Sequence, residues 1–349
     1  MFGNAKIMAI VTLALPLAAL AGCVGLSGRA GDDAPPRFYA NPGIPLPAPK
    51  LLAWTDHLAR MATKAFPQAD ALPPGHALPE AAAARQFAAA RGARLALTWF
   101  GHSTFLIRIG GRVVMTDPVI TERIGRGALH LHRLPPLLPD PALIRRLDVI
   151  VISHADYDHL DLPSLAMLAA RFPDAQVYVP EGTGFLVRRA GFANVTELAW
   201  YERAAPAGLT VTAVPAIHAV RRLPFPVDSM HWAGYVVSDG HRRVYFAGDT
   251  AAGPYFAETR RRLGPVDVAL VPAGAWSPRG FERPYHAEPE EAAAIARTMG
   301  ARLAIGMHWG TFALSEEEPS EQKRRFLAAS TAQTRTTVFR IGETRVLAR

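Results

Sequence analysis

Histidine and aspartate residues follow four short apolar runs of this chain, and each run is typical of a buried β-strand. These residues are His154, Asp156, Asp158, His159, His218, Asp249 and His308. In open α/β sheets, ligand sites gather just beyond the strand ends, and imidazole and carboxylate groups bind Zn, Mn and Fe. A single histidine in this position is usually a capping or surface residue, but four clusters in the same context predict a metal site.

The elements that must position these side chains alternate between strands and helices. Strands are predicted at residues 95–100, 104–109, 112–116, 148–153, 176–179, 209–215, 233–238, 243–247, 268–271, 303–307 and 337–340. Helices are predicted at residues 79–91, 162–171, 254–263, 289–299 and 320–331. This alternation indicates an α/β protein. No linker-like stretch interrupts residues 95–349, so we expect them to form one domain.

The first 23 residues are typical of an exported bacterial lipoprotein. Lys6 precedes an apolar run at residues 7–20, which is too short and too interrupted to span a membrane comfortably and suits the core of a signal peptide. The run ends in Leu-Ala-Gly-Cys, which resembles the lipobox whose cysteine is acylated. Residues 1–22 are therefore predicted to be a lipoprotein signal peptide, with a lipid anchor at Cys23. An ordinary cleaved signal peptide with a chance cysteine is the alternative.

The residues around and after this cysteine carry further expectations. Val24 is not the Asp that resembles an inner-membrane retention signal, so we expect a location on the periplasmic side of the outer membrane. Cys23 is the only cysteine, which excludes an intrachain disulfide and a cysteine metal site. Residues 23–50 are rich in Gly, Pro, Ala and Asp and predict a flexible tether. Residues 51–94 predict an N-terminal helical extension, and residues 95–349 predict the catalytic domain.

The motif His154-x-Asp156-x-Asp158-His159 resembles the His-x-His-x-Asp-His motif of the metallo-β-lactamase superfamily. His218, Asp249 and His308 follow in the order of that family's remaining ligands. Several phrases resemble the branch that contains N-acyl-phosphatidylethanolamine phospholipase D and ascorbate-6-phosphate lactonase-like enzymes: TWFGHST at 98–104, TDP at 116–118, DHLD at 158–161, AGDT at 247–250, HAEPEEA at 286–292 and HWGTF at 308–312. The resemblance extends over residues 95–349.

The resemblance implies a fold and a set of residue roles. The family fold is an αβ/βα sandwich of two mixed β-sheets flanked by helices. Two divalent metal ions are implied, with Zn as the first expectation and Mn or Fe as the alternatives. The implied roles are these: His154 and His218 hold the first ion, Asp158, His159 and His308 hold the second, and Asp249 bridges both together with a hydroxide. Two ions about 3.5–4 Å apart bring the pKa of a bridging water toward neutrality. Asp158, Asp249 and His286 are the implied catalytic residues.

Asp156 departs from the family motif, which has a histidine at this place. A carboxylate can still bind a metal through oxygen, but it is shorter and adds a negative charge. A site richer in carboxylate favours Mn or Fe over Zn. In the alternative, Asp156 faces away from the site and the first ion binds weakly or not at all. We expect Asp156 to be a ligand, either directly or through water.

Three further residues are candidates for supporting roles. His102 lies in a tight Gly-His-Ser-Thr turn, where it could bond to backbone or support a metal ligand. Asp117 precedes Pro118 and is expected to orient its loop. His286 stands just before a helix start at Pro289. The branch resemblance places His286 near the substrate, where it would contact a phosphate or a leaving group, and a simple helix-flanking histidine is the alternative.

The whole pattern predicts a metal-dependent hydrolase of a phosphodiester, such as an N-acyl-phosphatidylethanolamine-like phospholipid. A lactonase or other ester or amide hydrolase is the second hypothesis, and a non-catalytic metal-binding envelope lipoprotein is the third. The formal charge of +8 could indicate nucleic acid, but arginine pairs such as Arg145 and Arg146 are scattered and form no long basic run. We therefore expect a small-molecule or phospholipid substrate, a membrane contact through Cys23 and no nucleic acid. The sequence leaves the oligomeric state open.

Overall fold

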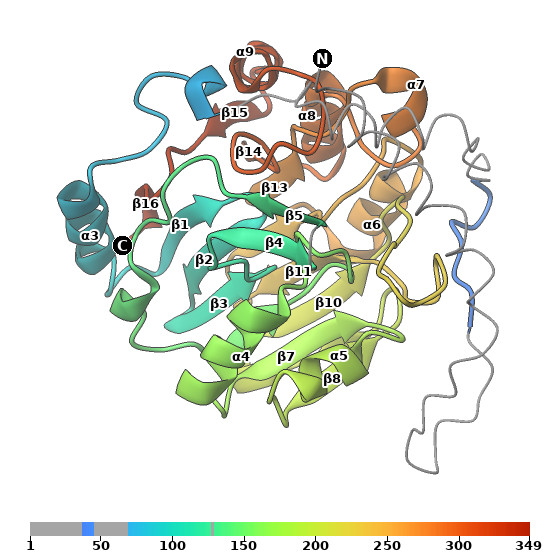
Figure 1. Cartoon of the computed structure of the whole chain (residues 1–349), viewed down its shortest axis with the longest axis horizontal. Helices are drawn as coiled ribbons and strands as arrows, with labels where there is room; N and C mark the ends of the chain where they lie inside the picture. Colours follow the sequence, from blue (N-terminus) through green and yellow to red (C-terminus); the bar gives the residue numbers. More distant parts are fainter. Residues whose placement is uncertain (1–36, 45–68, 127–128) are drawn as a thin grey trace, which may run out of the picture. The chain divides into compact units, whose positions relative to one another are not determined.

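Two mixed β-sheets form the centre of the computed structural model, which describes residues 37–44, 69–126 and 129–349 (Figure 1). The strands of the first sheet are β1 Leu95–Gly101, β2 Thr104–Ile109, β3 Arg112–Thr116, β6 Val149–Val151, β7 Gln176–Pro180, β8 Val195–Leu198 and β16 Thr344–Ala348. The strands of the second sheet are β9 Arg203–Ala204, β10 Thr210–Val214, β11 Gly234–Ser238, β12 Arg243–Phe246, β13 Val268–Pro272, β14 Leu303–Met307 and β15 Arg335–Val338. The predicted fold class is confirmed.

Each sheet is part antiparallel and part parallel. The first has the order β16-β1-β2-β3-β6-β7-β8, and its strands are antiparallel from β16 to β3 and parallel from β3 to β8. The second has the order β15-β14-β13-β12-β11-β10-β9, with parallel pairing from β12 to β15. Parallel strands bring their carboxyl ends to one edge of a sheet. The loops after β3 and β6 therefore meet, as do the loops after β12 and β14.

Helices flank both sheets. Those beside the first sheet are α3 Glu80–Ala89, α4 Leu162–Arg171 and α5 Gly184–Arg189, and those beside the second are α6 Tyr255–Leu263, α8 Pro289–Thr298 and α9 Pro319–Ala328 (Figure 1). The remaining elements are η1 Ala69–Ala71, η2 Pro141–Leu143, η3 Pro206–Gly208, α7 Arg279–Glu282 and the hairpin of β4 Arg123–Arg126 with β5 Leu129–His132. Among the described residues, no helix has the length and apolar character needed to cross a membrane.

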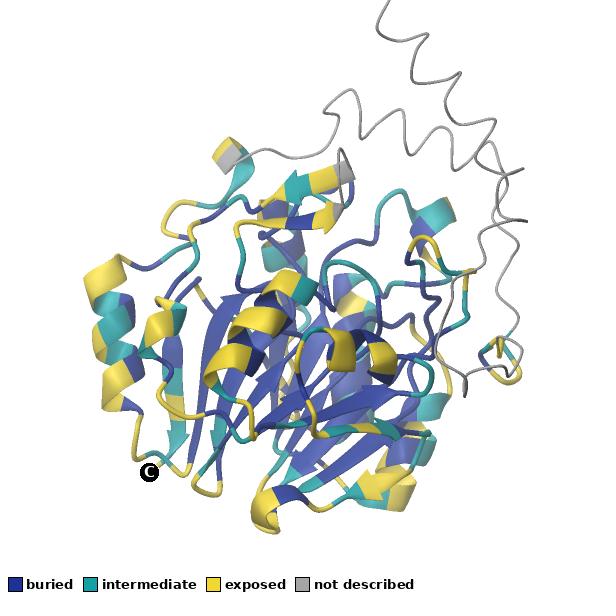
Figure 2. Cartoon of the chain, turned by 60° about the horizontal axis from the view of Figure 1, so that its bottom comes forward, coloured by how far each residue is buried: buried dark blue, intermediate teal, exposed yellow. Residues whose placement is uncertain are grey.

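Apolar side chains of both sheets share one core. Leu97 and Phe105 of the first sheet and Tyr235 and Phe246 of the second are fully buried in it. Figure 2 shows that the strands are buried along most of their length, whereas the helices present exposed faces. Burying one large apolar side chain stabilises a fold by roughly 1.5–3 kcal/mol. The core therefore fixes the strand ends from which the candidate site residues emerge.

Described residues that precede residue 95 pack against the domain. Asn41, inside the predicted tether, is buried against the domain, and α3 packs through Phe87. Tyr39 also packs there and stacks on His231 with ring centroids 4.4 Å apart, and composition does not reveal such contacts. One compact unit extends from Arg37 to Arg349, and the predicted domain bounds stay a prediction. The predicted signal peptide, Cys23 and residues 45–68 lie outside the described residues.

The predicted strands and helices of residues 79–349 agree with the structure to within three residues at their ends. The strands and α-helices that the prediction missed are β4, β5, β8, β9, β16, α5 and α7. They are short, and their apolar residues repeat too few times to give a clear period. The hairpin of β4 and β5 lies between residues 116 and 148, where no strand or helix was predicted.

Candidate metal centre

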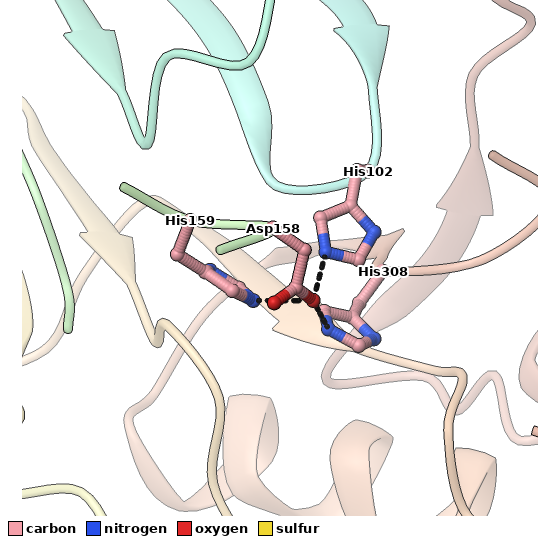
Figure 3. A group of neighbouring side chains, drawn as sticks. All are labelled: His102, Asp158, His159 and His308. Atoms are coloured by element: carbon pink, nitrogen blue, oxygen red, sulfur yellow. Dashed lines mark hydrogen bonds and ion pairs between the residues drawn. The ribbon is translucent and has the colours of Figure 1, made fainter. Parts of the chain in front are cut away.

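The structure brings the predicted metal ligands together from four loops that follow strands. His154, His218 and Asp249 offer donor atoms that lie within 4.8 Å of one another, and so do Asp158, His159 and His308 together with His102. Figure 3 shows Asp158 and His159, which are neighbours on one loop, pointing toward His102 and His308, which come from two other segments. Two adjacent donor clusters, rather than one, therefore occupy this edge of the sheets.

Asp249 belongs to the first cluster and also lies next to two histidines of the second. Its Oδ2 atom lies 3.2 Å from His159 Nε2 and 3.0 Å from His308 Nε2, in addition to its place beside His154 and His218. Distances of this size between donor atoms suit ligands that share one ion. A carboxylate placed between two donor sets can bridge two ions.

The donor atoms are buried and have no hydrogen-bond partner within the described part of the chain. The atoms concerned are Nε2 of His154, His159, His218 and His308, and Oδ1 of Asp249. Buried polar atoms in proteins are almost always hydrogen-bonded, so a group of them that faces one point needs an explanation. Divalent metal ions satisfy imidazole nitrogen and carboxylate oxygen together. The residues present therefore fit metal ions.

The charges of the centre also favour cations. Burial alone would raise the pKa of Asp249, but His159 and His308 hold it well below its usual range. Burial alone would lower the pKa of His159, but Asp249 and Asp158 raise it well above its ordinary value. Burial and neighbouring positive charges lower the pKa of His154, which keeps that imidazole neutral. Positive charge therefore stabilises the ionised carboxylates, and either protons or metal ions supply it.

Two neighbours orient the predicted ligands of the second cluster. His159 Nδ1 donates to Asp117 Oδ2 at 2.6 Å, and Asp117 Oδ1 accepts from the amide of Ser153 at 2.6 Å. His102 Nε2 donates to Asp158 Oδ2 at 2.9 Å, so its ring supports a carboxylate and does not bond to backbone. Partners of this kind fix the tautomer and direction of metal-binding groups. Asp117 acts directly on a histidine ring, which is more specific than the predicted role of orienting a loop.

Backbone geometry at the centre is unusual. His102, Asp117 and His308 have positive φ angles of 51°, 33° and 61°. Such conformations cost about 1–3 kcal/mol each in non-glycine residues and gather at functional sites. Gly248, directly before Asp249, has a φ of 61°, and a Cβ there would lie 2.5 Å from Cβ of Ser153. The loop after β12 thus requires glycine to place Asp249.

Asp156 turns its carboxylate toward the first cluster. Its Oδ2 atom lies 3.8 Å from His154 Nε2 and 3.8 Å from His218 Nε2. Its Oδ1 atom accepts from the amide of Arg221 at 2.6 Å. One oxygen is therefore directed to the histidine pair while the other holds the neighbouring loop, which is the arrangement expected of a ligand or a water-bridged ligand.

His286 lies at the edge of the centre, just before the capped start of α8. Its Nδ1 atom is 3.8 Å from Asp249 Oδ2, and its Nε2 atom is 3.9 Å from Oε2 of Glu282. Burial, helped by Glu317, raises the pKa of Glu282 to about 8. Neither Glu282 nor Asn41 was predicted from the sequence, because neither follows a strand or belongs to a recognisable motif.

Comparison with known proteins agrees with this arrangement. The profile of the family described as Beta-lactamase superfamily domain matches residues 112–309. The chain is 34% identical over 241 residues to N-acyl-phosphatidylethanolamine-hydrolyzing phospholipase D 1 of Caenorhabditis elegans, across 64% of this chain and 66% of that protein. It is 26% identical over 250 residues to a UPF0173 metal-dependent hydrolase of Pyrobaculum aerophilum, across 68% of this chain and 95% of that protein.

A solved structure shows the same fold. Igni18, a metallo hydrolase from the archaeon Ignicoccus hospitalis, is 25% identical with a TM-score of 0.53, over 72% of this chain and 97% of that one. The chain spans slightly less than two thirds of the nematode protein's length but nearly all of each archaeal protein. The matched family region carries all four loops that supply the predicted metal ligands. Shared fold, shared region and converging donors agree, and the chain belongs to the metallo-β-lactamase superfamily as a metal-dependent hydrolase.

Proposed function

We propose that this hydrolase uses two metal ions to cleave a phosphodiester, such as that of an N-acyl-phosphatidylethanolamine-like phospholipid. The observation that carries the proposal is the position of Asp249, whose Oδ2 atom lies 3.2 Å from His159 Nε2 and 3.0 Å from His308 Nε2 beside the cluster of His154 and His218. Two-ion sites are a common arrangement in enzymes that displace groups from phosphorus. The likeness to a nematode N-acyl-phosphatidylethanolamine-hydrolyzing phospholipase D supports the same substrate class.

The residues divide the work as follows. When bound, two divalent ions lower the pKa of a shared water molecule and neutralise charge that develops on the attacking and leaving oxygens. Asp158 and Asp249 provide the negative charge that retains such ions, and Asp117 holds the ring of His159 in place. Burial lowers the pKa of His286, so its imidazole is neutral and has one N–H to donate. His286 is thereby suited to a hydrogen bond with a phosphate oxygen or the leaving group.

The donor set bears on the identity of the ions. Four histidines suit Zn, whereas the carboxylates of Asp156, Asp158 and Asp249 make the set harder and suit Mn or Fe. We infer Zn as the first candidate because histidine nitrogens of both donor clusters lie next to Asp249. Mn and Fe are the alternatives that reconstitution must compare.

A lipid anchor at Cys23 completes the proposal. The Leu-Ala-Gly-Cys sequence at residues 20–23 supports acylation of this cysteine and a place on the periplasmic side of the outer membrane. Tethering an enzyme to a bilayer raises the effective concentration of a lipid substrate. The anchor and the phospholipid substrate therefore support each other.

Hydrolysis assays on the full chain, loaded with Zn or with Mn, test this function. The substrates are bis(4-nitrophenyl) phosphate, N-acyl-phosphatidylethanolamine in phosphatidylcholine vesicles, and a panel of lactones. We expect metal-dependent turnover of the phosphodiesters, abolished in Asp249→Ala and kept in Asp174→Ala, an exposed aspartate away from the centre. Turnover of lactones alone would favour the lactonase hypothesis. Bound metal without any turnover would favour the non-catalytic one.

A further inference from the structure

Five arginines line one cavity on the first sheet. They are Arg91, Arg108, Arg112, Arg145 and Arg146, and we call the space between them the arginine cavity. They come from the segment after α3, from β2 and β3, and from the connection between η2 and β6. The cavity has a volume of about 180 Å³. Residues far apart in the sequence thus converge here by folding.

The arginine cavity lies at the end of β3 opposite the metal centre. Arg112 begins this strand, and Asp117 follows its other end. Five residues of extended strand span about 16 Å. The cavity is therefore separate from the donor clusters, and a group bound in it would not touch them.

The positive charge of the arginine cavity is only partly neutralised. Asp148 Oδ1 accepts from Arg146 Nε and Nη2 at 2.9 and 2.6 Å, and it lies 3.6 Å from Arg112 Nη1. Within the described part of the chain, Arg91, Arg108 and Arg145 form no ion pair, and no carboxylate lines the cavity. Five arginines against one aspartate leave a formal surplus of four positive charges.

Arg108 shows the consequence of this surplus most clearly. Its guanidinium stacks 4.8 Å above the ring of Phe87, and its Nε atom is buried without a hydrogen-bond partner among the described residues. Burial, followed by the nearby charge of Arg91, lowers the pKa of Arg108. Like charges held together in a partly buried place are unfavourable unless an anion joins them.

We propose that the arginine cavity binds a phosphate group. The planar fork of arginine matches phosphate oxygens in pairs, and a phosphate carries more than one negative charge. The volume is below the roughly 300–1,000 Å³ that is typical of sites for drug-sized ligands, so the cavity suits a compact anion. The phosphate belongs either to free inorganic phosphate or to the headgroup of an anionic phospholipid. The proposal does not depend on the substrate of the metal centre.

Calorimetric titration of the metal-loaded full chain tests the arginine cavity. The probes are inorganic phosphate and the soluble lipid dihexanoylphosphatidic acid, each titrated into wild type, Arg108→Gln, Arg145→Gln and Arg189→Gln. Hydrogen bonds to charged groups contribute enough that we expect each cavity variant to bind phosphate about tenfold more weakly. Arg189, an exposed arginine on α5, is the matched control and should leave affinity unchanged.

The design separates the cavity from the metal centre. If phosphate binds the metal ions, its binding persists in the arginine variants and is lost in Asp249→Ala. If phosphate binds the arginine cavity, its binding persists in Asp249→Ala and is weakened in the arginine variants. Stronger binding of dihexanoylphosphatidic acid than of phosphate identifies the lipid headgroup as the source, and the opposite order identifies free phosphate. Equal affinity of wild type and Arg145→Gln, or an equal loss in Arg189→Gln, would overturn the proposal. Arg145 is exposed, so its variant decides the matter if Arg108→Gln fails to fold.

Discussion

Asn41 pairs with both backbone groups of His218, although the two residues lie 177 positions apart. Its Nδ2 atom donates to the carbonyl oxygen of His218 at 3.0 Å, and its Oδ1 atom accepts from the amide of His218 at 3.3 Å. The same Oδ1 atom accepts from Trp232 Nε1 at 3.1 Å. A side chain that satisfies both polar groups of one residue fixes that residue's orientation. Residues 37–44 are therefore part of the support of the metal centre.

Replacing Asn41 tests this support. Asn41→Ala leaves buried backbone groups of His218 without a partner, which costs about 1–3 kcal/mol. We expect a lower affinity for the first ion, measured by chelator competition, with the second ion retained. Asn194→Ala removes an exposed asparagine and serves as the control. Unchanged affinity for both ions in Asn41→Ala would show that the contact has no role in metal binding.

The contact between Asp117 and His159 leads to a second prediction. Asp117→Asn keeps the side-chain volume but removes the charged acceptor that holds His159 Nδ1 at 2.6 Å. Loss of such partners typically lowers metal affinity by about 10–100-fold. The affinity for the second ion should decrease, because His159 belongs to the cluster that would hold that ion. Elemental analysis after dialysis against a chelator series measures it, and equal retention by wild type and variant would contradict it.

The site residues that directly follow strands could be predicted from the sequence, whereas the contacts made by distant segments could not. His154 and His308 were predictable because each follows a fully buried strand whose apolar run is unmistakable. Asn41 was not, because it stands in a Pro- and Gly-rich stretch and acts through a residue 177 positions away. The arginine cavity was not predictable either, since Arg91 and Arg146 read as scattered surface charges until β2, β3 and β6 bring them together. The sequence pattern predicts which residues follow a strand, but it does not predict which side chains from distant segments contact them.

Asp249 should be the ligand whose loss removes most metal. It is the carboxylate that lies next to histidines of both donor clusters, so Asp249→Ala leaves two cations without their common counter-charge. We expect loss of both ions, whereas His218→Ala should release mainly the first. Metal content by elemental analysis, with circular dichroism to confirm folding, gives the answer. Wild-type metal content in Asp249→Ala would exclude the two-ion assignment.

The proposed anchor predicts a simple cellular result. Cys23→Ala removes the acyl acceptor and should either release the protein from membranes or leave its signal peptide uncleaved. Membrane fractionation together with the mass of the mature protein distinguishes these outcomes from normal processing. Cys23→Ser has nearly the same size as the native residue and should behave as Cys23→Ala does. An unchanged mature mass and unchanged fractionation in both variants would rule out acylation at this position.

Asp156 offers the sharpest test of the first ion's site. Its Oδ2 atom lies 3.8 Å from His154 Nε2 and 3.8 Å from His218 Nε2, within reach of an ion that those histidines share. Asp156→His restores the family motif and exchanges a carboxylate for an imidazole, so the affinity for Zn relative to Mn should rise. It also removes the bond that Asp156 Oδ1 accepts from the amide of Arg221, which loosens that loop.

A third variant separates these two effects. Asp156→Asn keeps an oxygen for the Arg221 amide but loses the negative charge, so it should lower the affinity for the first ion without raising the affinity for Zn relative to Mn. Metal identity, stoichiometry and phosphodiesterase rate would be measured for wild type, Asp156→His and Asp156→Asn, each reconstituted with Zn and with Mn. A change in preference confined to Asp156→His assigns the carboxylate to the ion. Identical values in all three proteins would mean that Asp156 has no part in the centre and serves the loop alone.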